Sequence, residues 1–148
     1  PLRLVWMPNE SVRPVHAAYG RDGDRVSFAD AFPFLIASRA ALELLNERLG
    51  AELPMNRFRP NLVVKGCKPF EEDTWNRIRI GDVELAVVKP CARCEVTTID
   101  KETLERSKDP LKTLGKYRKQ KLGAIFGQNV IPLNEGRIQL GMTVTVLS

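Results

Sequence analysis

Long hydrophobic runs, histidine and cysteine are all scarce in this sequence. The longest uncharged apolar run, residues 31–38, is far too short to cross a bilayer, so we expect neither a membrane span nor a membrane partner. The first six residues contain neither an initiator methionine nor a signal-peptide pattern. Three cysteines are an odd number, which argues against a disulfide framework and favours reduced thiols in the cytoplasm.

Familiar catalytic motifs are also absent. The sequence contains no GxSxG nucleophile motif, no HExxH motif, no P-loop and no Rossmann glycine pattern. The single histidine, His16, falls in a predicted loop, where a surface role is expected. A structural zinc site usually needs four ligands, and the chain offers only Cys67, Cys91, Cys94 and His16, without a second closely spaced pair. Zinc binding is therefore a weak alternative.

Size and charge are compatible with one globular domain. The 148 residues are 43% apolar, which is enough to bury a substantial core, and the formal net charge is +5. A moderate positive charge suits an anionic ligand or nucleic acid without identifying either. We treat residues 1–148 as a single domain, and a chain that begins at Pro1 is expected to be a piece of a longer protein.

Two helices are predicted from their ends. The clearer one runs from Ser38, which can cap its start, to Leu49, and Gly50 can end it. Leucines repeat along one of its faces, as expected for a helix that packs on a core. A second helix is predicted to begin after the capping residue Asp109, which a proline follows, and to run towards Lys121.

Short segments with a β pattern fill most of the remaining chain. They alternate or run apolar, and the Gly81-Asp82 pair is a tight turn that makes a hairpin of two of them. The first 24 residues are rich in turns and are predicted as loops. Many short strands and few helices favour a mainly β fold with a few helices (α+β), closed as a barrel or rolled sheet. The predicted strands are residues 25–28, 62–64, 77–80, 83–88, 94–100, 126–130, 137–140 and 143–147.

The sharpest local feature is the Cys91-Ala92-Arg93-Cys94 stretch. An arginine between two thiols favours the thiolate, which is the form that binds metals or attacks electrophiles. Besides zinc, the alternatives are a thioredoxin-like redox pair and two buried thiols that act as small apolar fillers. The redox pair is disfavoured because the residues that follow are β-branched rather than helical. The motif alone leaves a functional site and simple burial equally open.

Three other charged segments have both a functional and a plain interpretation. Arg57 and Arg59 point to one side of an extended chain, where they suit phosphate or carboxylate or else line a solvated edge. Residues 106–121 are basic enough for nucleic acid, but they lack interleaved aromatic residues, and the wet face of a helix is preferred. Residues 70–75 contain three carboxylates, for which a polar loop anchored by Trp75 is preferred over acid–base catalysis.

An ordered series of these segments resembles the MOSC domain family. The series extends from about Phe28 to the end of the chain, and no single piece carries it. The closest similarity is to the branch of the mitochondrial amidoxime reducing component and its bacterial relatives. Members of that branch bind a molybdenum–molybdopterin cofactor and reduce N-hydroxylated compounds by removing oxygen. The segments are RFRPNLVV (57–64), EDTW (72–75), IGDV (80–83), PCARC (90–94), TTID (97–100), PLKTL (110–114), FGQN (126–129) and GRIQLG (136–141).

The resemblance implies a MOSC-type β-barrel and a set of cofactor ligands. Cys94 would be the protein ligand of molybdenum and the centre of catalysis, because it is the second cysteine of the matching stretch. A soft thiolate suits a thiophilic metal, and guanidinium groups or a helix amino terminus suit the pterin phosphate. The positions that match cofactor-binding residues of the family are Ser38, Arg59, Asn61, Arg93 and Asn129.

The resemblance also implies partners and one competing role. A reductase of small N-hydroxylated substrates needs an external electron donor, such as a ferredoxin-like or flavin reductase protein. Relatives carry an additional amino-terminal β-rich region that contributes cofactor contacts, and some end in a ferredoxin-like domain that three cysteines cannot supply. This chain alone is therefore expected to bind cofactor weakly or not at all. The alternative is a sulfur carrier for metal–sulfur cluster assembly, with a persulfide on Cys94. Nucleic-acid binding ranks last.

Overall fold

The computed structural model describes every residue from Pro1 to Ser148, and its regular elements are mainly strands. The predicted mainly β fold with a few helices is confirmed. The helices are α1 (Arg39–Leu49) and α2 (Leu111–Tyr117), with 3-10 turns η1 (Met55–Arg57), η2 (Glu71–Thr74) and η3 (Glu95–Thr98). The strands are β1 (Phe34–Ser38), β2 (Leu62–Val64), β3 (Arg77–Ile80), β4 (Val83–Ala92), β5 (Lys119–Gln120), β6 (Gly123–Pro132) and β7 (Val144–Val146).

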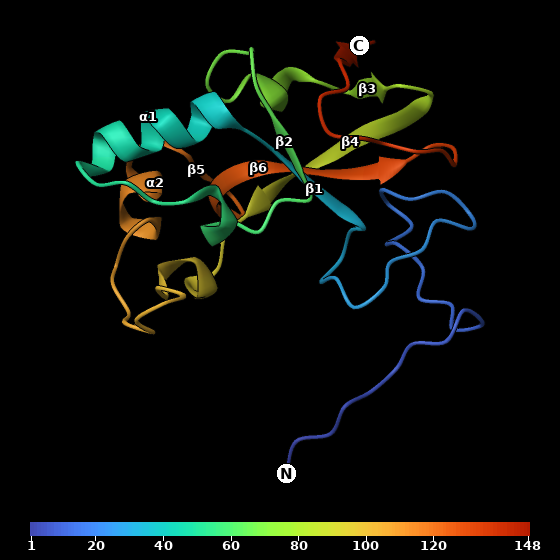
Figure 1. Cartoon of the computed structure of the whole chain (residues 1–148), viewed down its shortest axis with the longest axis horizontal. Coiled ribbons are helices and arrows are strands. Elements are labelled where there is room, and N and C mark those ends of the chain that lie inside the picture. The colour runs from blue at the N-terminus through green and yellow to red at the C-terminus, as the bar shows by residue number, and fades with distance from the viewer.

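The strands curl into a nearly closed barrel, and both α-helices lie at one end of it (Figure 1). The strand order is β2-β1-β6-β4-β3-β7, with β5 paired to β6, and only β1 and β2 run parallel. The long strands β4 and β6 lie side by side at its centre. Register shifts between Val87 and Lys89 and between Pro90 and Ala92 distort β4. The ladder is therefore irregular just before Cys94.

Helix α1 begins and ends where the sequence predicts. The Ser38 hydroxyl accepts a hydrogen bond from the Ala41 amide at 3.2 Å and so caps the first turn. Gly50 ends the helix in the left-handed region, at φ 66°. Ala41, Leu42 and Leu45 are buried on the face that meets the sheet, which explains the leucine repeat.

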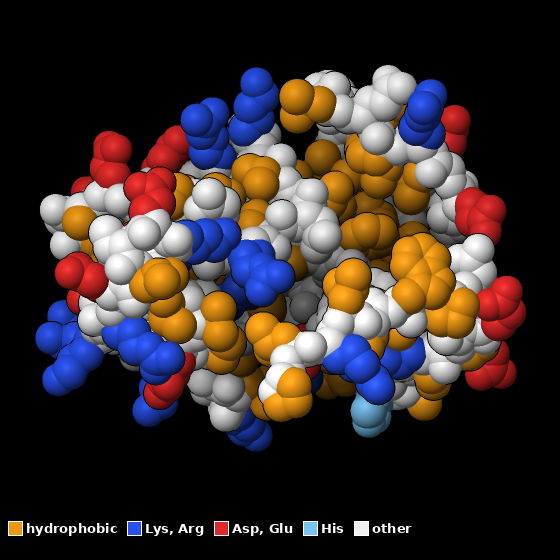
Figure 2. Space-filling view, turned by 60° about the horizontal axis from the view of Figure 1, so that its bottom comes forward, with side chains coloured by type: hydrophobic (Ala, Val, Ile, Leu, Met, Phe, Trp, Pro, Cys, Tyr) orange, Lys and Arg blue, Asp and Glu red, His pale blue; other side chains and the backbone are white.

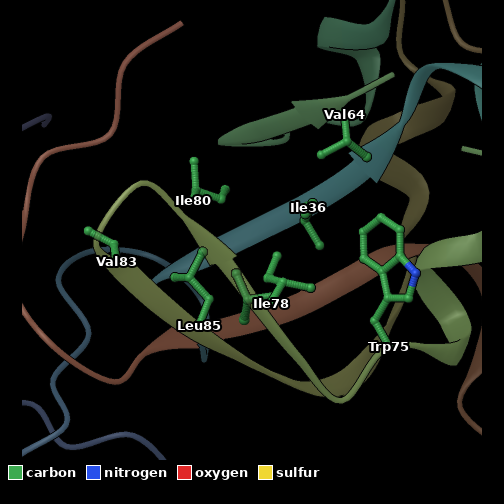
Figure 3. Packing of buried hydrophobic residues seen from close by; sticks show 8 residues of the cluster. Ile36, Val64, Trp75, Ile78, Ile80, Val83 and Leu85 are labelled. Carbon is green, nitrogen blue, oxygen red and sulfur yellow. The ribbon is translucent and has the colours of Figure 1, made fainter. Parts of the chain in front are cut away.

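Two large hydrophobic clusters stabilise the barrel. One joins β1, β2, β3, β4 and β6, and its side chains point toward one another around Ile78 (Figure 3). Trp75 belongs to it and is 7% exposed, so the prediction that this tryptophan anchors residues 70–75 is confirmed. The other cluster joins α1 and α2 to the sheet, and the rings of Phe58 and Phe126 stack in it with centroids 3.9 Å apart.

Two predicted strands at the ends of the chain are wrong. Residues 25–28 make only an isolated bridge, between Pro14 and Arg25. Residues 137–140 are irregular and exposed, because a local turn, in which the Met142 amide donates to the Gln139 carbonyl at 3.3 Å, stands where the strand was predicted. Strand β1, in contrast, lies in a segment that was noted only for its apolar residues. The first 24 residues form no regular strand or helix, as predicted, and no helix of the fold is long and apolar enough to cross a membrane.

Two further predictions need correction in type or length. Residues 94–100 are not a strand but contain η3, because the hydroxyls of Thr97 and Thr98 donate to carbonyls three residues earlier and tighten the chain. Helix α2 ends at Tyr117 rather than near Lys121, because the following residues turn back as β5 and pair with β6. In both places a local bond pattern replaces the predicted continuation.

Candidate functional site

A cavity of about 770 Å³ opens between three parts of the chain. Its walls are formed by residues 28–35, which lead into and along β1, by residues 57–61 after η1, and by residues 89–97 at the end of β4. This volume lies in the range of pockets that hold small ligands and cofactors. Of the predicted site residues, those that line the cavity are Arg59, Asn61, Arg93, Cys94 and Asn129.

Cys94 presents a free, exposed thiol at the wall of this cavity. The residue follows β4 and precedes η3, and its carbonyl accepts hydrogen bonds from the Thr97 amide at 3.1 Å and the Thr97 hydroxyl at 2.9 Å. These bonds fix the backbone and leave the sulfur free to bind a ligand. Cys91 lines the same cavity and is also a free thiol, so the CxxC stretch is not a pair of buried fillers.

Arg93 is held rigidly beside Cys94. Its two terminal nitrogens donate hydrogen bonds to the Cys91 sulfur at 2.9 Å and to the Phe58 carbonyl at 2.7 Å. Its Nε is buried and has no partner. A buried guanidinium donor without a partner is unusual in a folded protein, since such groups are normally satisfied. Arg93 therefore has a donor available for an anionic ligand.

Arg57 is a second arginine at this cavity and, unlike the half-buried Arg93, it is buried. The cofactor-binding positions inferred from the resemblance did not include it. It is 7% exposed, forms an ion pair with Asp100, and leaves its Nε buried without a partner. The sequence signal for Arg57 was its alternation with Arg59, which would place both side chains on one side of an extended segment. Arg57 ends η1 instead of lying in an extended segment, yet both arginines line the cavity.

Backbone geometry sets the positions of the two polar residues that follow. Arg59 adopts a left-handed conformation at φ 54°, which is rare for a residue with a side chain. The Asn61 side chain accepts a hydrogen bond from the Leu35 amide at 2.9 Å, and the Asn61 amide donates to the Leu35 carbonyl, also at 2.9 Å. Asn129 donates from its side chain to the Lys89 carbonyl at 3.1 Å. The two asparagines thus brace the cavity walls as well as line them.

The cavity is strongly cationic. Arg57, Arg59, Lys89 and Arg93 line it, and Asp30 is the only acidic residue among the lining residues. Figure 2 shows the same imbalance on one face of the molecule, where basic side chains gather near the centre beside a hollow and acidic ones lie mostly at the edges. Such a concentration of one charge attracts anions. No group of three His, Cys, Asp or Glu side chains is placed to hold a metal ion by itself.

Ser38 lies outside this cavity. It is fully buried, its hydroxyl caps α1, and its amide donates a hydrogen bond to the Glu72 carboxylate at 3.0 Å. The Glu72 carboxylate thus lies at the amino terminus of α1, where the resemblance implied the phosphate of the pterin. The structure brings the other predicted ligands together but places Ser38 apart from them.

Glu72 is a fully buried carboxyl group, and one of its oxygens has no hydrogen-bond partner. Burial raises its pKa, and hydrogen bonds from Ser38 oppose this only in part. The pKa of the half-buried Cys67 thiol is also raised, first by burial and then by the charge of Glu72. Sequence alone did not separate Glu72 from its two acidic neighbours, because only burial distinguishes them. Neither Glu72 nor Cys67 lines the cationic cavity.

Replacing Glu72 with glutamine is expected to flatten the dependence of stability on pH. Because the folded pKa is raised, the contribution of this group is fully present below its unfolded pKa of about 4.3 and is lost as the pH rises through the folded value. Urea midpoints measured between about pH 4 and pH 8 should fall with pH more steeply in the wild type than in Glu72→Gln. The exposed Glu47→Gln serves as control, and parallel curves for wild type and Glu72→Gln would contradict the expectation.

Comparisons with known proteins agree on one family. A family model described as MOSC domain matches residues 23–145. The chain is 43% identical over 150 residues to mitochondrial amidoxime-reducing component 1 of Mus musculus, an alignment that covers 95% of this chain and 44% of that protein. The corresponding values for the Homo sapiens protein are 41% over 159 residues, 99% and 47%. The chain therefore spans less than half the length of these curated relatives.

A solved structure is similar in fold. The crystal structure of YiiM from Geobacillus stearothermophilus superposes with a TM-score of 0.60, and the match covers 79% of this chain and 55% of the other. Sequence identity over the match is 20%, so this likeness concerns the fold alone.

Proposed function

Because this chain belongs to the MOSC domain family and has the barrel expected for it, we propose that it binds a molybdenum–molybdopterin cofactor within an oxidoreductase. The proposed reaction is the reduction of small N-hydroxylated compounds by removal of oxygen. The relatives are named for an amidoxime-reducing role, and this supports the substrate class.

The observation that carries this proposal is a free thiol and unpartnered guanidinium groups in one cavity. The exposed sulfur of Cys94 is a soft ligand for molybdenum. The buried Nε of Arg93 and the Arg59 side chain would bind the phosphate of the pterin, and Asn61 and Asn129 would line its place. These residues therefore fit the cofactor in chemistry, and the cavity suits a ligand of that size.

When bound, the cofactor supplies a two-electron redox centre. The overall reaction converts R–NH–OH, two electrons and two protons into R–NH2 and water. The protein binds and orients: Cys94 fixes the centre, and the cationic wall compensates the negative charge of the ligand. Apolar side chains along residues 28–35 line part of the cavity and offer the ligand an apolar surface.

The electrons must come from outside this chain, because its three free cysteines cannot hold an iron–sulfur cluster of four thiolates. We propose a ferredoxin-like or flavin-containing reductase protein as donor. Free thiols are compatible with a reducing compartment such as the cytoplasm, and a mitochondrial location is part of the names of the relatives alone.

The full-length protein, expressed in a host that makes the cofactor, tests the proposal. We expect molybdenum and pterin to copurify with the wild type, and Cys94→Ser to lose nearly all of the metal, because a hydroxyl is a poor soft-metal ligand. Cys67→Ser, which alters a thiol outside the cavity, is the matched control and should retain metal. Wild-type protein without molybdenum or pterin would refute the assignment. Transfer of sulfur from a cysteine desulfurase to Cys94 in such protein would favour a sulfur carrier instead.

A further inference from the structure

An ion pair between Arg57 and Asp100 joins two walls of the cavity. One wall carries Arg59, two residues beyond Arg57, and the other carries Cys94, six residues before Asp100. The Arg57 side chain is 8% exposed, whereas that of Asp100 is 38% exposed, so the guanidinium is shielded from water and the carboxylate only in part. Loss of Asp100 would be costly on the arginine side, because the buried Arg57 charge is then left without its partner.

The Asp100 carboxylate also organises the turn that follows η3. One of its oxygens accepts hydrogen bonds from the amides of Glu102 at 2.8 Å and Thr103 at 3.0 Å, and the other oxygen meets Arg57. The two amide bonds, Thr103 first, and then the Arg57 guanidinium lower the pKa of Asp100 to about 2. The carboxylate therefore stays charged at any physiological pH.

The segment between Asp100 and Cys94 is short and internally bonded, so a shift at one end reaches the other. The Thr97 amide and hydroxyl both bond to the Cys94 carbonyl, and Thr97 and Thr98 are buried. A second tie lies beside the ion pair, since the Lys101 ammonium donates to the carbonyl of the residue before Arg57. The wall that carries the thiol is therefore fastened to η1 close to Arg57.

We propose that the Arg57–Asp100 pair positions the Cys94 thiol within the cavity, by holding the η3 wall against η1. Both are positioning residues that act through Cys94. The consequence for cofactor retention rests on the proposed function, whereas the consequence for the thiol itself holds for the cofactor-free protein.

Asp100→Asn isolates the ion pair. Asparagine keeps an oxygen for the two turn amides but removes the charge that faces Arg57. In cofactor-free protein we expect iodoacetamide to alkylate Cys94 severalfold faster than in the wild type, because the exposed thiol, no longer held in one place against the cavity wall, can be approached from more directions. Alkylation of Cys67, which lies outside the cavity, should be unchanged. Peptide mass spectrometry gives both rates from one sample.

Four further variants separate positioning from general loosening. Glu84→Gln breaks the ion pair of Glu84 with Arg77 on the β3–β4 hairpin, outside this cavity, and should leave the Cys94 rate unchanged. Arg57→Lys keeps a cation opposite Asp100 and should restore a nearly wild-type rate, whereas Arg57→Met should behave like Asp100→Asn. In the double variant Arg57→Met/Asp100→Asn, Cys94 should be alkylated no faster than in either single variant, because both substitutions remove the same contact.

The rate of cofactor release is a second measurement of this positioning. In loaded protein we expect Asp100→Asn to release pterin roughly tenfold faster than Glu84→Gln, measured by pterin fluorescence. An unchanged Cys94 alkylation rate in Asp100→Asn overturns the inference, as does an equal acceleration at Cys67. If the wild type holds no cofactor, the proposed function fails, and the alkylation rates still decide whether the pair positions the thiol.

Discussion

Alanine at position 127 is expected to destabilise the protein by about 2–5 kcal/mol, the sum of backbone strain and overlap. Gly127 lies in β6 at φ 78°, a conformation that L-residues with a side chain rarely adopt. An added Cβ would also stand 2.6 Å from the Ile36 carbonyl oxygen in β1. Backbone on both sides cannot move away without separating the two strands. Such a loss is a large part of the usual stability of a domain this size.

The matched control is Gly115→Ala in α2. Gly115 has no neighbour within 4 Å of an added Cβ, and alanine favours a helix over glycine by up to about 1 kcal/mol. Urea unfolding should therefore move the midpoint down for Gly127→Ala and slightly up for Gly115→Ala. A midpoint for Gly127→Ala within error of the wild type would contradict the structure of this strand pair.

Gly127→Ala should also change the shape of the cavity. Strand β6 pairs Asn129 with Leu35 of β1, and the Asn61 side chain holds the Leu35 amide. Separation of β1 from β6 at Gly127 would displace Leu35, Asn61 and Asn129 together, and all three line the cavity. We therefore expect folded Gly127→Ala protein to retain less cofactor than Gly115→Ala protein.

Elements with local signals could be predicted from the sequence. Helix α1 has a capping serine and a terminal glycine, and the Gly81-Asp82 turn fixes the β3–β4 hairpin. The prediction failed where other bonds override residue preference. Residues 94–100 are rich in β-branched side chains, but threonine hydroxyls bond to nearby carbonyls, and at residues 137–140 the Met142 amide closes a local turn onto the Gln139 carbonyl.

The candidate site, too, could be predicted from the sequence only in part. Its six predicted residues came from a family resemblance, and five of them line one cavity, but no spacing in the sequence shows that Arg59 and Cys94 meet there. Lys89 joined the site only through tertiary structure, whereas Arg57 had been paired with Arg59 on the expectation of an extended segment, which the structure replaces with η1. The sequence also could not show that Ser38 lies outside the cavity, where its amide donates to the buried Glu72 carboxylate of η2.

Arg59→Gly is expected to separate stability from function. The residue is exposed and strained at φ 54°, so glycine should leave the fold as stable or more stable by up to about 1 kcal/mol. Loss of the guanidinium from the cavity should reduce pterin retention roughly tenfold or more, the usual value of a hydrogen bond to a charged group. Urea midpoints and pterin content of the same preparations measure both effects.

Leu104→Gly is the control for Arg59→Gly, because Leu104 is also exposed, has a similar strain at φ 61°, and lies outside the cavity. It should show the same stability change with full pterin content. Equal loss of pterin in both variants would mean that backbone relaxation, and not the missing charge, weakens binding. Full retention in Arg59→Gly would remove Arg59 from the ligand set. A strained backbone kept at a charged cavity residue is best explained by the place that this conformation gives its side chain.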